Sequence, residues 1–393
     1  MFDLNKIQGA LKEFGFDGWL FFDFHGANVL ARRILDFEPT SLVTRRFYYM
    51  VPAEGEPTKL VHRIESGTLD HLPGDKRIYL KWEELEAGIA ELVKGMKQVA
   101  MEYSPRNAIP YVSKVDGGTI DLVKGAGVEV ASSGDLIQFF EATLSDEQWQ
   151  SHVDTEKLTT QAFDLCWQTI AEGVGAGTPR TETEVQKVIL DHFEKHDLIP
   201  DHPPIVAVGP HSGDPHFEPT PDRDVPVAEG ELVMIDLWAR LNKPKAVFSD
   251  ITRMGYVGSS VPEKYAKIFD IVAAARDAAI DLIRDRFAAG KELRGWEVDD
   301  AAREVIEKAG YGQYFVHRTG HSIGEDLHGN GTHMDNLETH DDRLVLPNTL
   351  FSIEPGIYTD EFGVRLEVNV FVDGSGGVHV TGGVQNEIRR ILG

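Results

Sequence analysis

Two segments 113 residues apart share a pattern that constrains the fold more than any other feature of the chain. Gly177 is followed by Glu184-Val185, and Gly290 is followed at the same spacing by Glu297-Val298. Each glycine separates a long amphipathic helical pattern from a shorter one, and strand-like runs come next. This repetition predicts a domain of two related halves, with a site where their strands meet. Chance similarity between amphipathic helices is the alternative.

Helix signals define the extent of this domain. Ser145 with Gln148 forms a capping box, and a helical pattern follows to residue 172. Before it, strand-like runs (17–22, 46–51, 58–62 and 98–102) alternate with helical patterns. We therefore expect an α+β protein: a smaller α/β domain over 1–144 and a pseudo-twofold domain of helix-helix-strand repeats over 145–393.

The charge of the chain limits its partners. The formal net charge of −25 disfavours nucleic acid and anionic membranes. No apolar run is long enough to cross a bilayer, and we see no signal peptide. The single cysteine, Cys166, excludes an internal disulfide and a thiolate zinc site, so we expect a cytoplasmic protein.

Four carboxylates lie on or beside apolar strand-like runs. Asp236 interrupts the apolar run 231–238, Asp250 follows in 248–253, Glu354 ends the run 350–353, and Glu367 belongs to the alternating segment 363–370. Because burying a lone carboxylate costs several kcal/mol, each needs a partner. For any one alone, a cap or salt bridge is the ordinary explanation.

The stretch from residue 317 to 328 adds three histidines, His317, His321 and His328, with glycines at 320 and 324. Any one of them alone is as well explained as a surface histidine. Together, four carboxylates and an imidazole form a hard-ligand set suited to Mn, Co, Fe or Zn. That much negative charge suits two ions about 3.5–4 Å apart.

The ordered set Asp236, Asp250, His321, Glu354 and Glu367 resembles the metallopeptidase family M24, which has the pita-bread fold. The segments 249–253, 320–324 and 352–358 carry the resemblance. It covers residues 145 to 393, and the N-terminal part is similar to the extra domain of the creatinase and prolidase branch. The resemblance implies a metalloexopeptidase, either an Xaa-Pro dipeptidase (prolidase) or an Xaa-Pro aminopeptidase.

The resemblance also implies roles for individual residues. Asp236 would chelate one metal ion, His321 and Glu354 the other, and Asp250 and Glu367 would bridge them, holding a hydroxide that attacks the substrate. Glu354 would also shuttle the proton. His328 and His216 would act on the substrate, and His317 and Arg365 would line the pocket for proline or the substrate carboxylate.

Manganese is the expected metal, with Co, Zn or Fe as alternatives, and the expected partners are small peptides with proline second, together with a second copy of the chain in a homodimer. We expect the loop 329–343 to form a rim of the site, although a solvated charged loop is as good an explanation. A creatinase-like amidinohydrolase, a metal-dependent lyase and a non-catalytic binding protein remain alternatives for the function.

Overall fold

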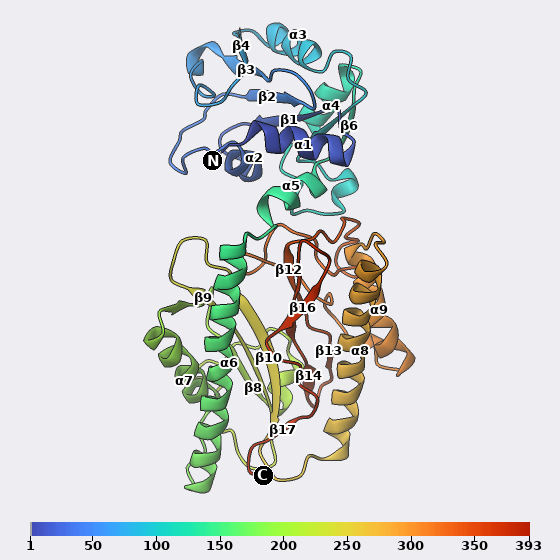
Figure 1. Ribbon diagram of the computed structural model, residues 1–393. Coiled ribbons are helices and arrows are strands. Elements are labelled where there is room, and N and C mark those ends of the chain that lie inside the picture. The colour runs from blue at the N-terminus through green and yellow to red at the C-terminus, as the bar shows by residue number, and fades with distance from the viewer. Residues whose placement is uncertain (1) are drawn as a thin grey trace. The chain divides into compact units, whose positions relative to one another are not determined.

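The computed structural model describes residues 2–393. The contacts within the chain divide it into two compact units, Met1–Glu141 and Ala142–Gly393 (Figure 1). The division falls three residues before the end of the N-terminal domain expected from the sequence, which we placed at residue 144.

The first unit is built on a six-stranded sheet with the order β4-β3-β2-β1-β5-β6. Only β2 runs against its neighbours; β1 is parallel to β5, β5 to β6, and β3 to β4. The carboxyl ends of the other five strands therefore lie at one edge of the sheet. The strands are β1 (Gly18–Asp23), β2 (Phe47–Pro52), β3 (Thr58–His62), β4 (Asp75–Tyr79), β5 (Gln98–Met101) and β6 (Glu129–Ser132).

Helices cover both faces of this sheet because β1 is buried on both sides. Trp19 and Phe21 pack with α1 (Leu4–Phe14), α2 (Val29–Ile34) and α5 (Gly134–Glu141). Leu20 and Phe22 point the other way and pack with α3 (Trp82–Leu92) and α4 (Gly117–Gly125). The alternation of side chains along a strand thus produces the α/β layering predicted for this part of the chain.

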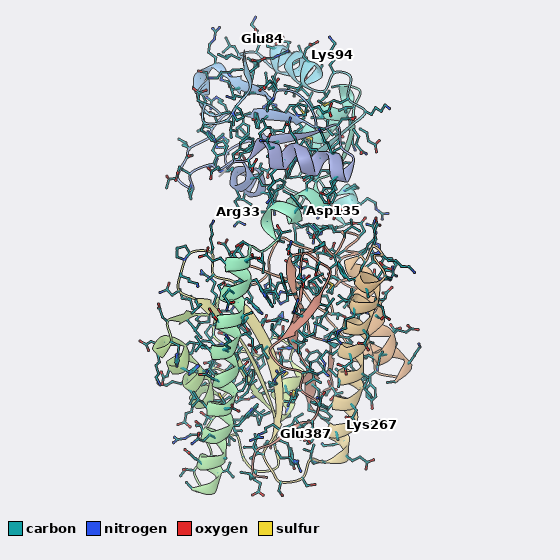
Figure 2. All side chains as sticks on the ribbon, viewed as in Figure 1. Arg33, Glu84, Lys94, Asp135, Lys267 and Glu387 are labelled. Carbon is teal, nitrogen blue, oxygen red and sulfur yellow. The ribbon has the colours of Figure 1, made fainter. Side chains whose placement is uncertain are left out.

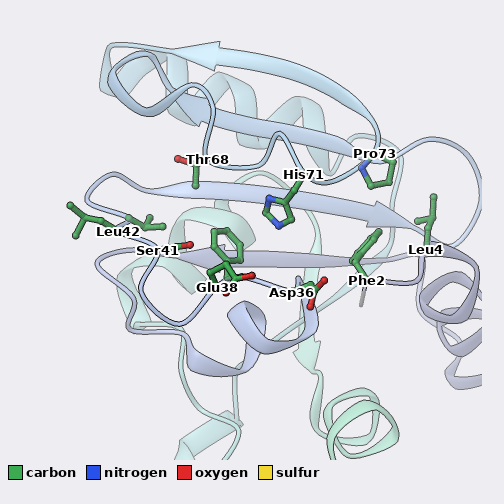
Figure 3. Close-up of a pocket in the computed structure, with 11 residues that line it drawn as sticks. Phe2, Leu4, Asp36, Glu38, Ser41, Leu42, Thr68, His71 and Pro73 are labelled. Carbon is green, nitrogen blue, oxygen red and sulfur yellow. The ribbon is translucent and has the colours of Figure 1, made fainter.

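A cavity of about 870 Å³ opens in this unit beside the segment 36–43. Figure 3 shows Asp36, Glu38 and His71 among its lining side chains, with Phe2 and Leu42 at its sides. The His71 ring bonds the carbonyl of Leu35 through Nε2 at 2.9 Å. The cavity thus has two carboxylates and no lysine or arginine among its lining residues.

The second unit contains the predicted repeat. Its two long helices are α6 (Asp146–Gly175) and α8 (Glu263–Ala288), and its shorter ones are α7 (Glu182–Lys195) and α9 (Gly295–Lys308). Each long helix is followed by a glycine with left-handed φ, +72° at Gly177 and +60° at Gly290. The first helix continues three residues past the predicted end at residue 172, because the break comes only at Gly177.

The repeated Glu-Val pairs have the same role in both halves. Glu184 accepts the backbone N–H of Thr181 at 3.0 Å, and Glu297 accepts that of Arg294 at 2.9 Å. The valine that follows each glutamate is fully buried. The repeat marks the start of a second helix twice, which confirms the predicted halves.

The strands between and after these helices form three sheets. One has the order β17-β10-β9-β7, with β8 also paired to β9; another has the order β11-β12-β15-β16; β13 and β14 form a two-stranded ribbon. Figure 1 shows α6 and α8 on opposite sides of these strands. The strands are β7 (Leu198–Ile199), β8 (Ile205–Val208), β9 (Leu232–Leu241), β10 (Ser249–Tyr256), β11 (Ser322–Ile323), β12 (Thr349–Ile353), β13 (Gly356–Tyr358), β14 (Gly363–Arg365), β15 (Val368–Val372), β16 (Val378–Thr381) and β17 (Arg389–Arg390).

Charged side chains lie mainly at the surface of both units. Glu84, Lys94, Lys267 and Glu387 are exposed and point away from the ribbon in Figure 2. Among residues 2–393, none of the helices combines the length and the apolar character that a bilayer crossing requires.

Candidate metal centre

Strands β9 and β10 bring the first two carboxylates to one face. Asp236 is paired with Thr252 across the antiparallel ladder, and Asp250 is paired with Trp238. Because paired residues share a face and residues two apart on a strand do too, Asp236, Asp250 and Thr252 point the same way. Both aspartates are almost fully buried, at 6% and 4% exposure.

The second half of the unit supplies the glutamates. Glu354 comes directly after β12, and Glu367 comes directly before β15. Asn369 joins β15 to the first half through both of its amide atoms: it accepts the backbone N–H of Asp250 at 3.1 Å and donates to the carbonyl of Asp250 at 2.6 Å. The hydroxyl of Thr252 donates to Glu367 at 2.9 Å. The two halves therefore meet at the carboxylates, as the repeat predicted.

His321 completes this cluster from the loop before β11. Its Nε2 lies 3.3 Å from Asp250 Oδ2 and 3.5 Å from Glu354 Oε1. One ligand atom each from Asp250, His321 and Glu367 fall within 4.8 Å of one another. Ser352 holds the loop, because its hydroxyl accepts the backbone N–H of His321 at 2.9 Å and donates to Glu354 at 3.1 Å.

Gly320 and Gly324 of this loop differ in the space that a side chain would have. A Cβ on Gly320 would lie 2.0 Å from the carbonyl oxygen of Ser352, so only glycine lets the loop approach β12 this closely. A Cβ on Gly324 would meet nothing within 4 Å. The structure therefore requires glycine at position 320, and it gives no such reason for glycine at position 324.

Burial and mutual repulsion disfavour charge on this cluster. Burial, followed by the charges of Asp236 and Glu354, raises the pKa of Asp250 well above its usual range. Burial, followed by Asp250, has the same effect on Glu367. Burial raises the pKa of Glu354 to about 7. Like charges this close cannot all ionise without a counter-charge.

The donor set fits divalent metal ions. Asp236 Oδ1, Asp250 Oδ1 and Glu367 Oε1 are buried and have no hydrogen-bond partner among residues 2–393. Unsatisfied buried oxygens are costly, and metal ligation would satisfy them. Burial keeps the pKa of His321 well below its usual range, so its ring is neutral, the form that ligates a metal. Oxygen donors with one imidazole suit a hard or borderline cation.

Arg365 lies within this site and pairs with one of its carboxylates. The guanidinium is 3% exposed, and its Nη2 donates to Asp236 Oδ2 at 2.5 Å. It also donates to the Thr252 hydroxyl at 3.2 Å, the Tyr358 hydroxyl at 3.0 Å and the carbonyl of Pro215 at 3.0 Å. The hydrogen bonds of the Arg365 guanidinium thus go to residues in and next to the metal centre.

His317 stands at the end of a hydrogen-bonded chain that begins at Arg365. Its Nδ1 bonds the carbonyl of Arg318 at 2.7 Å and must carry the proton there, so Nε2 accepts from the Tyr358 hydroxyl at 2.7 Å. Tyr358 in turn accepts from Arg365. This chain fixes the tautomer and orientation of His317 beside the carboxylates.

His328 and His216 lie at the exposed side of the site. The ring centroid of His328 is 4.3 Å from that of His321. His216 is exposed, and it contributes to lowering the pKa of both His317 and His328, which burial chiefly causes. The structure therefore gathers all nine predicted site residues around one centre.

The prediction that the loop 329–343 forms a rim of the site is partly wrong. His333 and Asp341 are fully buried, not at a rim. Asp341 pairs with Arg343, Oδ2 to Nη2 at 2.5 Å, and accepts the backbone N–H of His333 at 2.8 Å. His333 accepts the backbone N–H of Ser322 through Nδ1 at 3.1 Å. These side chains brace the loop next to His321, while Glu338 and His340 are exposed.

Several residues that hold the ligands were missed from the sequence. Thr252 lies two positions after Asp250 on β10, and Ser352 lies two positions before Glu354 at the end of β12, so the period of a strand could have placed each beside its ligand. Asp299 of α9 and Tyr358 of β13 carried no comparable signal, because their contacts are made across elements distant in the chain.

Comparisons with known proteins agree with this geometry. The sequence pattern of metallopeptidase family M24 matches residues 154–374. The chain is 35% identical to the Xaa-Pro dipeptidase of Pyrococcus furiosus over 178 residues, 45% of this chain and 46% of that protein. It is 27% identical to the probable dipeptidase PepE of Mycobacterium tuberculosis over 339 residues, 84% of this chain and 82% of that one.

Solved structures show the same fold. The dipeptidase PepE of Mycobacterium ulcerans superposes with a TM-score of 0.63 at 23% identity, covering 98% of this chain and 96% of that chain. The expected pita-bread domain, preceded by a smaller α/β domain, is thereby confirmed. Because the family pattern spans the repeat and contains all five predicted metal ligands, the chain belongs to metallopeptidase family M24.

Proposed function

We propose that this chain is a metal-dependent exopeptidase that hydrolyses Xaa-Pro bonds in dipeptides or at the amino end of short peptides. The observation that carries the proposal is the buried cluster of Asp236, Asp250, His321, Glu354 and Glu367, with three carboxylate oxygens lacking a hydrogen bond among residues 2–393. The relative from Pyrococcus furiosus, named an Xaa-Pro dipeptidase, supports the choice of substrate.

Asp236 would hold one ion, His321 and Glu354 a second, and Asp250 and Glu367 would be shared between them. Divalent ions in such a site lower the pKa of water and polarise a carbonyl group. Four carboxylates favour two ions over one because a single divalent charge leaves the cluster strongly negative. We propose manganese as the metal, to be identified by elemental analysis, and a homodimer, to be measured by light scattering.

Glu354 is suited to move the proton. Without metal, burial raises its pKa to about 7, and a bound cation would lower that pKa and keep the carboxylate ionised to accept a proton. The carboxylate would accept a proton from the attacking water and deliver it to the proline nitrogen as the peptide bond breaks. Ser352, which donates to Oε1 at 3.1 Å, would keep the carboxylate oriented during both transfers.

The histidines would act on the substrate. His328 and His216, on the exposed side of the cluster, are placed to donate a hydrogen bond to the carbonyl oxygen as negative charge develops on it. His317, held by Tyr358, would form a wall of the pocket that takes the proline ring. Arg365 would support this pocket from behind while it orients Asp236.

The test is a substrate series measured with protein reconstituted with manganese. Xaa-Pro, Xaa-Pro-Yaa and Xaa-Ala peptides of matched Xaa should separate dipeptidase from aminopeptidase activity and show the need for proline. The proposal predicts hydrolysis of one or both proline substrates and at least about tenfold slower cleavage of Xaa-Ala. Equal rates on proline and alanine peptides, or no hydrolysis at any metal loading, would contradict it.

A further inference from the structure

A second cavity of the N-terminal unit, about 690 Å³ in volume, lies at the carboxyl edge of its sheet. Phe24 and His25 follow the end of β1, His62 ends β3, and Leu80 follows β4; all of them line the cavity. Open sheets with parallel strands bind ligands outside their carboxyl ends, where the connecting loops diverge. The volume is also in the range of cavities that hold small molecules.

The polar lining of this cavity is basic. Arg45, Arg46, His25 and His62 face it against a single carboxylate, Asp116. That carboxylate is already engaged as the N-cap of α4, where it accepts the N–H and the hydroxyl of Thr119 at 2.9 and 2.7 Å. A basic cavity is unexpected by chance in a chain of net charge −25, and the neighbouring cavity beside residues 36–43 contains acidic groups instead.

The cationic groups keep hydrogen-bonding capacity for a ligand. Arg46 makes no ion pair within residues 2–393, and its guanidinium and its backbone carbonyl both contact the Tyr79 hydroxyl, the carbonyl at 2.7 Å. One hydroxyl contact leaves most of the five N–H donors of a guanidinium for a ligand. His62 Nδ1 accepts the backbone N–H of Ile64 at 3.2 Å, so the neutral ring carries its proton on Nε2 and can donate. The planar guanidinium matches a phosphate or carboxylate in two-point contact.

Glu65, which does not line the cavity, also lies close to Arg45. Glu65 accepts the backbone N–H groups of Thr44 and Arg45, each at 3.0 Å for Oε2. The guanidinium of Arg45 is directed to its neighbour, with Nη1 donating to the Thr44 hydroxyl at 3.0 Å. Glu65 thus offsets part of the charge of Arg45, which leaves Arg46 as the stronger anion ligand.

Aromatic side chains flank these cations. Trp82 is 63% exposed and Phe24 is 44% exposed, and both line the cavity. One exposed aromatic residue is ordinary, but two at the mouth of one cavity, beside arginines, offer flat faces for a ring to stack on. The combination favours a ligand that has both a negative charge and a planar group.

We propose that this cavity binds a small aromatic anion, with its phosphate or carboxylate group at Arg46 and Arg45 and its ring against Trp82 and Phe24. The proposal concerns the N-terminal unit alone and stands apart from the proposed peptidase activity. A nucleotide and an aryl carboxylate share this chemistry, so the experiment must distinguish them.

The experiment is calorimetric titration of the full chain with four probes at equal ionic strength. Adenosine 5′-monophosphate and indole-3-acetate carry a ring and an anion, inorganic phosphate lacks the ring, and adenosine lacks the anion. We expect at least one ring-bearing anion to bind about tenfold more tightly than inorganic phosphate and than adenosine. Whichever of the two binds more tightly identifies the head group.

Variants test the location of binding. R46Q should weaken the tighter probe about tenfold or more, and W82A should weaken it while leaving the binding of inorganic phosphate unchanged. R77Q is the matched control, since Arg77 is an exposed arginine of β4 that does not line the cavity. Melting temperatures of all three variants should match that of the parent chain.

Three results would overturn the proposal: no binding of either ring-bearing anion at millimolar concentration, equal binding of adenosine, or equal weakening by R46Q and R77Q. Peptidase assays on R46Q should show unchanged activity, and they distinguish this site from the metal centre. If R46Q has a lowered melting temperature, W82A decides the location: a folded W82A chain that binds less of the ring-bearing anion supports the proposal.

Discussion

Asp299 accepts two hydrogen bonds from Thr319, one from the backbone N–H at 2.9 Å and one from the hydroxyl at 2.7 Å. Arg303, one helical turn further along α9, pairs with the same carboxylate at 3.0 Å and donates to the carbonyl of His317 at 2.9 Å. Helix α9, which supplies no ligand of its own, therefore fixes the segment on which His317 stands and from which His321 follows.

The substitution D299N should reduce both stability and activity. The amide keeps one acceptor but turns an NH₂ group toward Arg303 or Thr319, in a position that is fully buried. Disrupting a buried ion pair costs about 3–5 kcal/mol, and we expect unfolding by urea to show a loss of about 3 kcal/mol. D300N is the matched control, because Asp300 bonds the side chain of Asn336, at 2.7 Å, on the surface of α9, and should lose less than about 1 kcal/mol.

The kinetic constants of D299N and their dependence on pH distinguish a positioning role of Asp299 from a purely structural one. If Asp299 positions the histidine loop, kcat should fall more than KM rises under conditions where the variant remains folded, and added metal should restore little of it. A variant that is destabilised but has unchanged kcat and an unchanged pH profile would show that α9 supports the fold alone.

The substitution E354Q should abolish turnover without unfolding the protein. The amide cannot accept and return a proton, which removes a contribution of about 10²–10⁴-fold to the rate. Stability without added metal should be unchanged or higher, because burial and Asp236 raise the pKa of Glu354 and the amide removes that repulsion. E361Q is the control, since Glu361 is exposed and pairs with Lys264 away from the cluster. Retained turnover in E354Q would refute the assignment of the proton shuttle.

Metal binding should stabilise the protein through the same cluster. Ions that bind only the folded chain raise its stability by about 2.7 kcal/mol at a free concentration of one hundred times Kd. Melting curves with manganese should show this gain for the parent chain, and a chelator should reverse it. D250N and H321A should lose the response, while D281N, at an exposed position on α8, should keep it. If manganese stabilised D250N as much as the parent chain, the metal would bind elsewhere.

His152 should make stability depend on pH below neutrality. Burial lowers its pKa to about 4, and its ring bonds the carbonyl of Phe248 and the hydroxyl of Thr381, each at 2.7 Å. The unfolded chain takes up a proton near pH 6.5 and the folded chain does so only near pH 4, so the stabilisation is complete above pH 6.5 and is lost as the pH falls through this window. The loss amounts to about 3 kcal/mol.

Denaturant titrations of the parent chain and H152Q between pH 7 and pH 4 isolate this contribution. H152Q should be less stable at pH 7 but should lose less on acidification, so the two curves converge toward pH 4. H340Q, at an exposed histidine, should run parallel to the parent throughout. Parallel curves for H152Q would mean that His152 is protonated in the folded protein as readily as in the unfolded one.

What could be predicted from the sequence depended on local signals. Gly177 and Gly290 end helices through left-handed backbone, and Glu184 caps a helix start, so these positions show their roles within a few residues of chain. The ligands on β9 and β10 were predictable because a carboxylate inside an apolar strand needs a partner.

Contacts between distant elements could not be predicted in this way. The bond between Arg365 and Asp236 joins residues 129 positions apart, and it arises from how β14 approaches β9. His333 and Asp341 are polar residues in a polar loop, and only the packed structure shows that both are buried and that each accepts a backbone N–H. Where burial is decided by tertiary packing, residue type alone misleads.

The pair of glycines beside His321 offers a test with its own control. In G320A the new Cβ would lie 2.0 Å from the Ser352 carbonyl oxygen, closer than real Cβ contacts allow, so the loop or β12 must shift. Ser352 also holds His321 and Glu354, so the shift would displace two ligands together. We expect G320A to lose about 1–3 kcal/mol of stability and most of the additional stabilisation that manganese provides to the parent chain. G324A, where a Cβ meets nothing within 4 Å and φ is not left-handed, should lose little of either. Equal behaviour of the two variants would show that close backbone approach at position 320 does not govern the geometry of the metal centre.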